Sequence, residues 1–177
     1  AAPSLDGAIE LYEGIAEAGV PVRGGDTTRA DSVVLSVAAI GRAERVPGRA
    51  GARSGDLLVV TGPLGAAGAA FRAGRLVRPP LRIEEGRRLA AAAHAMLDIS
   101  DGLGLDARHI AERSGCRLEI DIDAVPLAAG ATVDDLAFGE DYELLAATPD
   151  PLDFAVIGRC VEGSGVSVDL GGWEHFG

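Results

Sequence analysis

Short apolar runs that end at glycine or acidic residues recur along this chain, and they constrain its fold more than any other feature. The runs at residues 32–40 (SVVLSVAAI) and 56–61 (DLLVVT) have the continuous apolar composition of strands buried on both faces. Further strands are predicted at residues 20–23, 96–99, 117–122, 142–147, 155–161 and 166–170. Helical spacing or alanine-rich composition predicts helices at residues 4–18, 64–76, 83–95, 103–113 and 132–137.

The irregular alternation of these elements, with several strands adjacent near the end, predicts an α+β fold in which helices pack on a mixed sheet. A regular doubly wound sheet would need a stricter alternation of strand and helix. A glycine- and arginine-rich connection at residues 48–55 predicts a domain boundary nearby. Hydrophobic residues make up 47% and aromatic residues 4% of the chain, so the core must consist mainly of Ala, Val, Leu and Ile.

Composition also bears on partners and compartment. The formal net charge of −11 argues against nonspecific nucleic-acid binding, which needs a basic surface. No apolar run reaches the ~20 residues of a membrane span, and the N-terminus lacks the pattern of a signal peptide, so we expect a cytoplasmic protein without membrane contact. Cys116 and Cys160 have no Cys or His at metal-ligand spacing, and we expect both to be reduced and buried.

The segment LDISDGL at residues 97–103 places two carboxylates and a hydroxyl between an apolar run and a predicted helix. Asp98 and Asp101 can bind Mg²⁺ together with phosphate oxygens, and the hydroxyl of Ser100 can contact a phosphate. The alternative is that Ser100 or Asp101 simply caps the helix, because both residue types are common caps. Spacing alone leaves the two interpretations open.

Three other segments have similar composition. In GGDTTR at residues 24–29, two glycines would let the backbone approach a ligand closely, and an acid and two hydroxyl groups follow them. An ordinary turn has the same composition and is the alternative. In GEDYEL at residues 139–144, Glu140 and Asp141 should point to opposite faces of an extended chain, so that one could face a site while the other is solvated; a charged strand entrance is the alternative. The sole tryptophan, Trp173 in GGWEHF, can stack on a flat ligand or anchor the C-terminus. His94 and His109 have no acid at a spacing that suggests a site.

Taken in order, these four segments resemble those of thiamine-monophosphate kinases, which belong to the superfamily of aminoimidazole ribonucleotide synthetase. The resemblance extends over essentially the whole chain. It implies a complete C-terminal domain at residues 45–177, preceded at residues 1–44 by the last helix and strand of an N-terminal domain that serves in ATP binding and dimerisation. It further implies a homodimer.

The activity implied by this resemblance is transfer of the ATP γ-phosphoryl group to thiamine monophosphate, which gives thiamine diphosphate and requires several Mg²⁺ ions. Asp26, Asp98 and Asp101 match Mg²⁺ ligands, and the two later aspartates would be central to catalysis. Gly25, Asp26, Arg49 and Ser100 match contacts to the nucleotide. Glu140 and Trp173 match contacts to the substrate.

The family's N-terminal portion supplies further Mg²⁺ ligands and much of the nucleotide site, so we expect weak or no kinase activity from these 177 residues alone. Two alternatives remain. The first is another ATP-dependent enzyme of the superfamily, such as aminoimidazole ribonucleotide synthetase, against which GGWEHF argues. The second is a non-catalytic module for binding or dimerisation.

Overall fold

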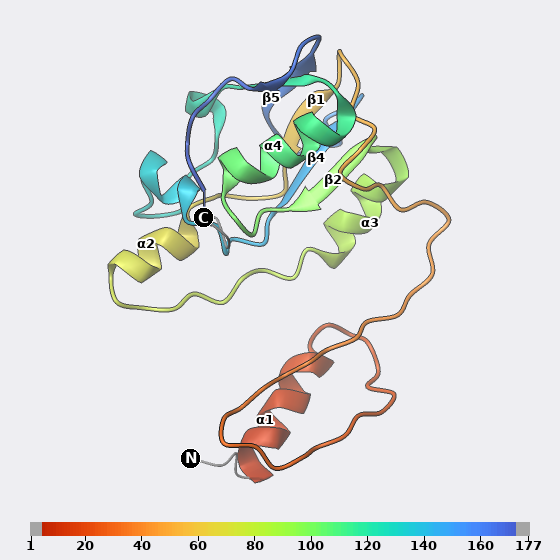
Figure 1. The fold of residues 1–177 in the computed structure, drawn as a ribbon, viewed down its shortest axis with the longest axis vertical. Coiled ribbons are helices and arrows are strands. Elements are labelled where there is room, and N and C mark those ends of the chain that lie inside the picture. Colours follow the sequence, from red (N-terminus) through yellow and green to blue (C-terminus); the bar gives the residue numbers. More distant parts are fainter. Residues whose placement is uncertain (1–4, 173–177) are drawn as a thin grey trace. The chain divides into compact units, whose positions relative to one another are not determined.

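A computed structural model describes residues 5–172 of the chain. Contacts divide the chain into two compact units, Ala1–Ala43 and Glu44–Gly177, and each unit is described by itself. Figure 1 shows the elements of both units. No helix within the described residues is long and apolar enough to cross a membrane.

The first unit contains one regular element, α1 (Leu5–Ala16), which confirms the helix predicted there. Gly19 follows this helix with a φ of 70°, a conformation that glycine adopts without steric cost. The strands predicted at residues 20–23 and 32–40 are wrong, because both segments lack regular structure. A strand needs a partner for its backbone N–H and C=O groups, and no described residue pairs with either segment. The side chains of Val34 and Ile40 are accordingly 80% and 98% exposed.

The second unit is built on a six-stranded sheet in the order β2-β4-β1-β5-β3-β6. Neighbouring strands are antiparallel except β3 and β6, which are parallel, so the predicted mixed sheet is confirmed. The strands are β1 (Leu57–Val60), β2 (Ala95–Asp98), β3 (Arg117–Ile120), β4 (Leu144–Thr148), β5 (Ala155–Val161) and β6 (Gly165–Val166). The helices are α2 (Ala66–Arg72), α3 (Ile83–Ala92) and α4 (Leu103–Ser114), with short 3₁₀ helices η1 (Ile122–Ala124) and η2 (Val133–Ala137).

Each face of the sheet is covered, as the continuous apolar strands predict. Alternate residues of β1 point to opposite sides: Leu58 joins a large buried cluster with residues of α4, whereas Val59 packs with Leu89 of α3. Helices α3 and α4 therefore lie on opposite faces of the sheet (Figure 1). Both cysteines are free and buried in the α4-side cluster, as predicted.

Candidate functional site

The site is built around the loop that joins β2 to α4. The backbone N–H groups of Ser100 and Asp101 donate hydrogen bonds of 3.0 and 2.9 Å to Oδ2 of Asp106, in the first turn of α4. The residue that caps α4 is Gly102, which has no side chain to accept a hydrogen bond. The interpretation of Ser100 or Asp101 as a helix cap is therefore wrong, because Asp106 reaches back and holds the loop from within the helix.

Asp106 is a functional residue that the sequence interpretation missed. It is 1% exposed and lies on the buried face of α4, next to Ala107 and one turn from Leu103 and Ile110. Burial raises the pKa of its carboxyl group, while the hydrogen bond from the N–H of Asp101 opposes that shift. A signal was present in the sequence, since an acid in the apolar stripe of an amphipathic helix needs a buried partner.

The segment GEDYEL is joined to this loop through backbone contacts. The N–H of Glu140 donates to the carbonyl of Ser100, and the N–H of Tyr142 donates to the carbonyl of Ile99, both at 2.9 Å. A Cβ atom on Gly139 would lie 2.1 Å from the Ser100 carbonyl oxygen, so only glycine fits this approach. Glu140 and Tyr142 adopt left-handed φ values of 59° and 52°. Strain of this kind, roughly 1 kcal/mol or more per residue, is concentrated at functional sites.

The acidic side chains of this segment have different roles. Glu140 is exposed, whereas Asp141 is buried and accepts hydrogen bonds of 2.7 and 3.1 Å from the N–H groups of Gly65 and Ala67 at the start of α2. The two acids do differ in environment, but the predicted extended geometry is wrong, because Glu140 has a left-handed φ and Asp141 is buried instead of solvated. Glu143 is also buried and pairs with Arg82 at 2.7 Å. Only Glu140 is left at the surface of the site.

Negative charge gathers around the phenol of Tyr142. Its hydroxyl donates to Oε2 of Glu140 at 3.3 Å. Burial raises the pKa of Tyr142, and the carboxylates of Glu140, Asp98 and Asp101 raise it further. Acids from LDISDGL and GEDYEL thus act on the same group, although some forty residues separate the two segments. Carboxylate oxygens are ligands that a hard divalent cation such as Mg²⁺ prefers, so the residue types present fit that ion.

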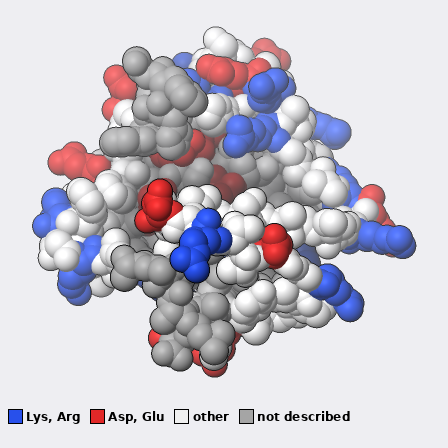
Figure 2. Space-filling model, turned by 60° about the horizontal axis from the view of Figure 1, so that its bottom comes forward, with Lys and Arg blue, Asp and Glu red and all other residues white. Residues whose placement is uncertain are grey.

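A cavity of about 940 Å³ opens beside these residues. One side is formed by Ser100, Asp101 and Glu140. The rest of the lining comes from α2, η2 and the residue after η2, and the rings of Phe71 and Phe138 there lie 5.0 Å apart. Charged side chains of Arg72, Asp134 and Asp135 line this part as well, so the cavity combines charged groups with an aromatic pair, as a site for a flat polar ligand would. Figure 2 shows acidic and basic side chains interspersed among the residues that it colours.

The remaining predicted site residues are not brought to this cavity by the described contacts. Gly25 and Asp26 belong to the unit Ala1–Ala43, where they are exposed. Arg49 is exposed, and its carbonyl accepts a hydrogen bond from Ser114, the last residue of α4. The backbone of Arg49 thus lies at the C-terminal end of α4, about 18 Å, the length of a twelve-residue helix, from the N-terminal end that follows Asp101. Trp173 lies outside the described residues.

Comparison with known proteins places the chain in a family. Residues 53–171 match the model of the AIR synthase related protein, C-terminal domain. Thiamine-monophosphate kinase from Aquifex aeolicus is 35% identical over an alignment of 192 positions. The alignment covers 88% of this chain and 63% of that protein. The Methanopyrus kandleri thiamine-monophosphate kinase is 38% identical, with 90% and 62% covered. The chain thus spans somewhat less than two thirds of the length of these relatives.

Solved structures agree with this result. A structure of AaThiL complexed with AMPPCP and TMP is 36% identical with a TM-score of 0.67, and the match covers 75% of this chain and 55% of that one. Escherichia coli HypE, a hydrogenase maturation protein, is 26% identical with a TM-score of 0.55, and 68% of this chain and 48% of that one are covered. These findings confirm the resemblance to thiamine-monophosphate kinases that the motifs indicate. The chain therefore belongs to the AIR synthase related proteins and contains their C-terminal domain.

Proposed function

We propose that this chain is the catalytic C-terminal part of a thiamine-monophosphate kinase, which transfers the γ-phosphoryl group of ATP to thiamine monophosphate. The observation that carries the proposal is the cavity in which Ser100 and Asp101 face the same space as Glu140. The similarity to a structure complexed with AMPPCP and TMP supports this assignment of the two substrates. The activity belongs to a protein of the relatives' length, of which this chain spans about 63% in one comparison.

The residues at the cavity and in the adjoining LDISDGL segment divide between the two substrates. Asp98 and Asp101 would hold Mg²⁺, which when bound neutralises phosphate oxygens and orients them for transfer. Ser100, beside them, would donate its hydroxyl to a phosphate oxygen. Both reactants are anionic at the reacting atoms. The rate enhancement would therefore come mainly from positioning the two substrates and neutralising the charge of their phosphate groups. The acceptor is already a phosphate oxygen, and the reaction therefore needs no general base.

The thiamine portion of the substrate would lie toward the other side of the cavity. Its thiazolium ring is positively charged, and Glu140 offers an exposed carboxylate at the cavity edge. The aromatic pair Phe71 and Phe138 offers a surface against which flat rings can pack. Trp173, which directly follows Gly172 in the sequence, is the additional substrate contact that the family resemblance predicts.

Gly25, Asp26 and Arg49 remain proposed nucleotide contacts that lie outside this cavity. We propose that they act in a homodimer with more than one Mg²⁺ ion per site. This arrangement would also account for apolar residues such as Val34 and Ile40, which are exposed in the unit Ala1–Ala43. A cytoplasmic location fits a reaction that consumes ATP.

The kinase assay should use a chimera that joins this chain to the part of the Aquifex aeolicus relative that it lacks. We expect thiamine diphosphate to form from thiamine monophosphate, ATP and Mg²⁺, and the 177-residue chain alone to form little or none. Aminoimidazole ribonucleotide synthetase activity would instead consume ATP with formylglycinamidine ribonucleotide as the co-substrate. A folded chimera that turns over that compound and not thiamine monophosphate would refute the proposal.

A further inference from the structure

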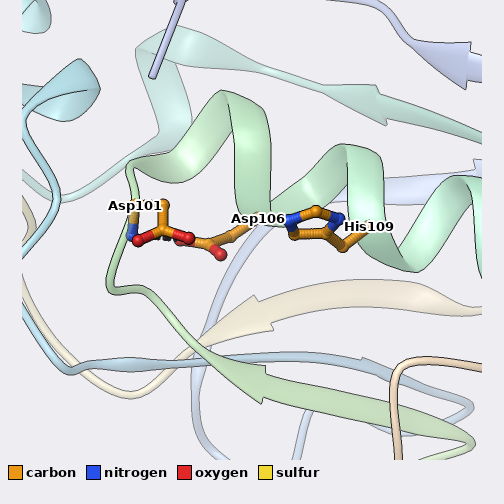
Figure 3. Close-up of side chains that lie close together, drawn as sticks. All are labelled: Asp101, Asp106 and His109. Atoms are coloured by element: carbon orange, nitrogen blue, oxygen red, sulfur yellow. Dashed lines mark hydrogen bonds between the residues drawn. The ribbon is translucent and has the colours of Figure 1, made fainter. Parts of the chain in front are cut away.

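Three side chains at the start of α4 form a cluster that the proposed kinase reaction does not use as a unit. They are Asp101 from the loop and Asp106 and His109 from the helix, and Figure 3 shows them facing one another. Asp106 and His109 are three residues apart, a spacing that places both on one side of a helix. One ligand atom from each residue lies within 4.8 Å of the ligand atoms of the other two.

Asp106 supplies an independent indication of a missing ligand. Its Oδ2 atom accepts the two hydrogen bonds from the loop, whereas Oδ1 is buried and has no hydrogen-bond partner within the described part of the chain. The whole residue is 1% exposed. A carboxylate oxygen can only accept, so a buried oxygen without a donor carries an unfavourable desolvation free energy. Burial indeed raises the pKa of Asp106, and a nearby cation would offset this cost.

From this geometry we propose that Asp101, Asp106 and His109 form a binding site for a first-row divalent transition metal ion of the Mn²⁺ or Zn²⁺ class. Two carboxylate oxygens and an imidazole nitrogen make a mixed donor set, and imidazole favours such ions over Mg²⁺, which prefers oxygen ligands. Bonds of about 2.1 Å place tetrahedral ligands about 3.4 Å apart, so small side-chain rotations would bring the three atoms into range. Water would complete the coordination, since Asp101 and His109 are only half-buried.

The site is distinct from the Mg²⁺ position of the proposed kinase reaction, although the carboxylate of Asp101 is common to both. Mg²⁺ is proposed at Asp98 and Asp101, of which Asp101 lines the cavity, whereas this ion would lie toward Asp106 and His109 on the helix. The inference does not depend on the proposed function, because binding of the metal ion needs neither ATP nor thiamine monophosphate.

Mn²⁺ is the appropriate probe because it does not bind thiols well, so Cys116 and Cys160 do not compete. Electron paramagnetic resonance measures Mn²⁺ affinity for the 177-residue chain, and electron spin echo envelope modulation detects a nitrogen directly bonded to the ion. We expect about one tightly bound Mn²⁺ per chain with a directly coordinated nitrogen. His109→Gln should remove the nitrogen signal and weaken binding at least tenfold.

His94→Gln is the matched control. His94 also lies beside a carboxylate, with Nδ1 2.9 Å from Asp56, but it is outside the cluster. This variant should keep both the affinity and the nitrogen signal, and circular dichroism should confirm that both variants are folded. Asp106→Asn is a second variant, which should lower affinity while keeping the nitrogen signal at saturation. The proposal is overturned if wild-type protein shows no nitrogen coupling, or if His109→Gln binds Mn²⁺ like the wild type.

Discussion

At the scale of single residues, two buried contacts give the candidate site its shape. Asp106 holds the loop at Ser100 and Asp101 from within α4, and Gly139 lets the second motif approach the same loop. Neither residue would bind a substrate phosphate or ring. Their effect on activity would come from the position they impose on Asp101 and Glu140.

Gly139→Ala should destabilise the protein more than a substitution at an otherwise similar glycine. Gly139 and Gly130 have φ values of 75° and 78°, but an added Cβ at Gly130 meets nothing within 4 Å. Both variants carry the backbone strain of alanine at positive φ, about 1 kcal/mol, and only Gly139→Ala adds a clash with the Ser100 carbonyl. Urea unfolding should show at least about 1 kcal/mol greater loss for Gly139→Ala. Equal losses would show that the close approach is unimportant.

Asp135 should make stability depend on acidic pH. Its bidentate ion pair with Arg72 and its hydrogen bonds with Thr132 hold the pKa of this carboxyl group below its usual value. Its stabilising contribution is therefore present above the unfolded-state pKa, about 3.9, and is lost as the pH falls through the lower folded-state value. Asp135→Asn should lower the free energy of unfolding at pH 7 by about 1 kcal/mol. The difference from wild type should shrink in urea titrations below about pH 3.5; a difference that grows on acidification would contradict the assignment.

At the scale of elements, the sheet separates the site from the smaller of the two core clusters. Helix α4 and the cavity lie on one face, whereas α3 covers the other face through Leu89 and Ala93. The strand β2 connects the core with the site, because Ala95 and Leu97 are buried and its last residue is Asp98. Substitutions in the α3-side cluster should consequently lower stability without changing ligand binding.

Leu89→Ala tests this separation. Leu89 is fully buried, and removal of its side chain should lower the free energy of unfolding by about 2–5 kcal/mol. Leu76→Ala, at a leucine that is 97% exposed, is the control and should change it by less than about 0.5 kcal/mol. Both variants should bind Mn²⁺ like the wild type while folded, as electron paramagnetic resonance can measure. Impaired binding in folded Leu89→Ala would mean that the two faces are coupled.

Most elements of the second unit could be predicted from sequence because their apolar patterns are local. The strand β3 and the end of α4 before Gly115 follow directly from alternation and from a glycine stop. Asp141 and Asp106 could not be assigned in this way, because their partners depend on backbone positions that only the tertiary fold fixes. His109 differs, because its neighbour Asp106 lies one turn before it in the same helix, and only the contribution of Asp101 depends on the tertiary fold.

At the scale of the whole molecule, the two units differ in how completely they bury apolar surface. The unit Glu44–Gly177 has a continuous core, whereas the unit Ala1–Ala43 exposes valines and leucine along residues 33–37. The strand predicted at residues 32–40 has the right composition but lacks the partner strand that would make it one. The sequence pattern indicates that a segment is suited to form a strand, but the strand forms only where another strand pairs with it.

A chain consisting of residues 44–177 should fold alone with a urea midpoint close to that of the 177-residue chain. Its core and its sheet lie within this range. It should also aggregate less on warming, because it lacks the exposed apolar residues around Val34 and Ile40. Urea unfolding and light scattering measure these two properties. A large loss of cooperativity on truncation would mean that the first unit contributes to the core.

Asp101 is proposed to act on the phosphate groups and Glu140 on the thiamine rings. Substitutions of these two carboxylates should therefore have different kinetic effects. In the kinase chimera, Asp101→Asn should lower kcat at least about a hundredfold, with little change in the KM for thiamine monophosphate, because the metal acts mainly in the transition state. Glu140→Gln should instead raise that KM about tenfold or more and alter kcat less. Glu119→Gln, at an exposed acid on β3, is a control that should leave both constants unchanged.

The proposed role of Asp101 in phosphoryl transfer is tested most directly by the rate of thiamine diphosphate formation by the Asp101→Asn chimera. The rate should be measured under saturating ATP, Mg²⁺ and thiamine monophosphate. We expect this rate to fall at least about a hundredfold while circular dichroism shows a folded protein. A folded Asp101→Asn chimera that forms thiamine diphosphate at the wild-type rate would contradict the proposed role of Asp101.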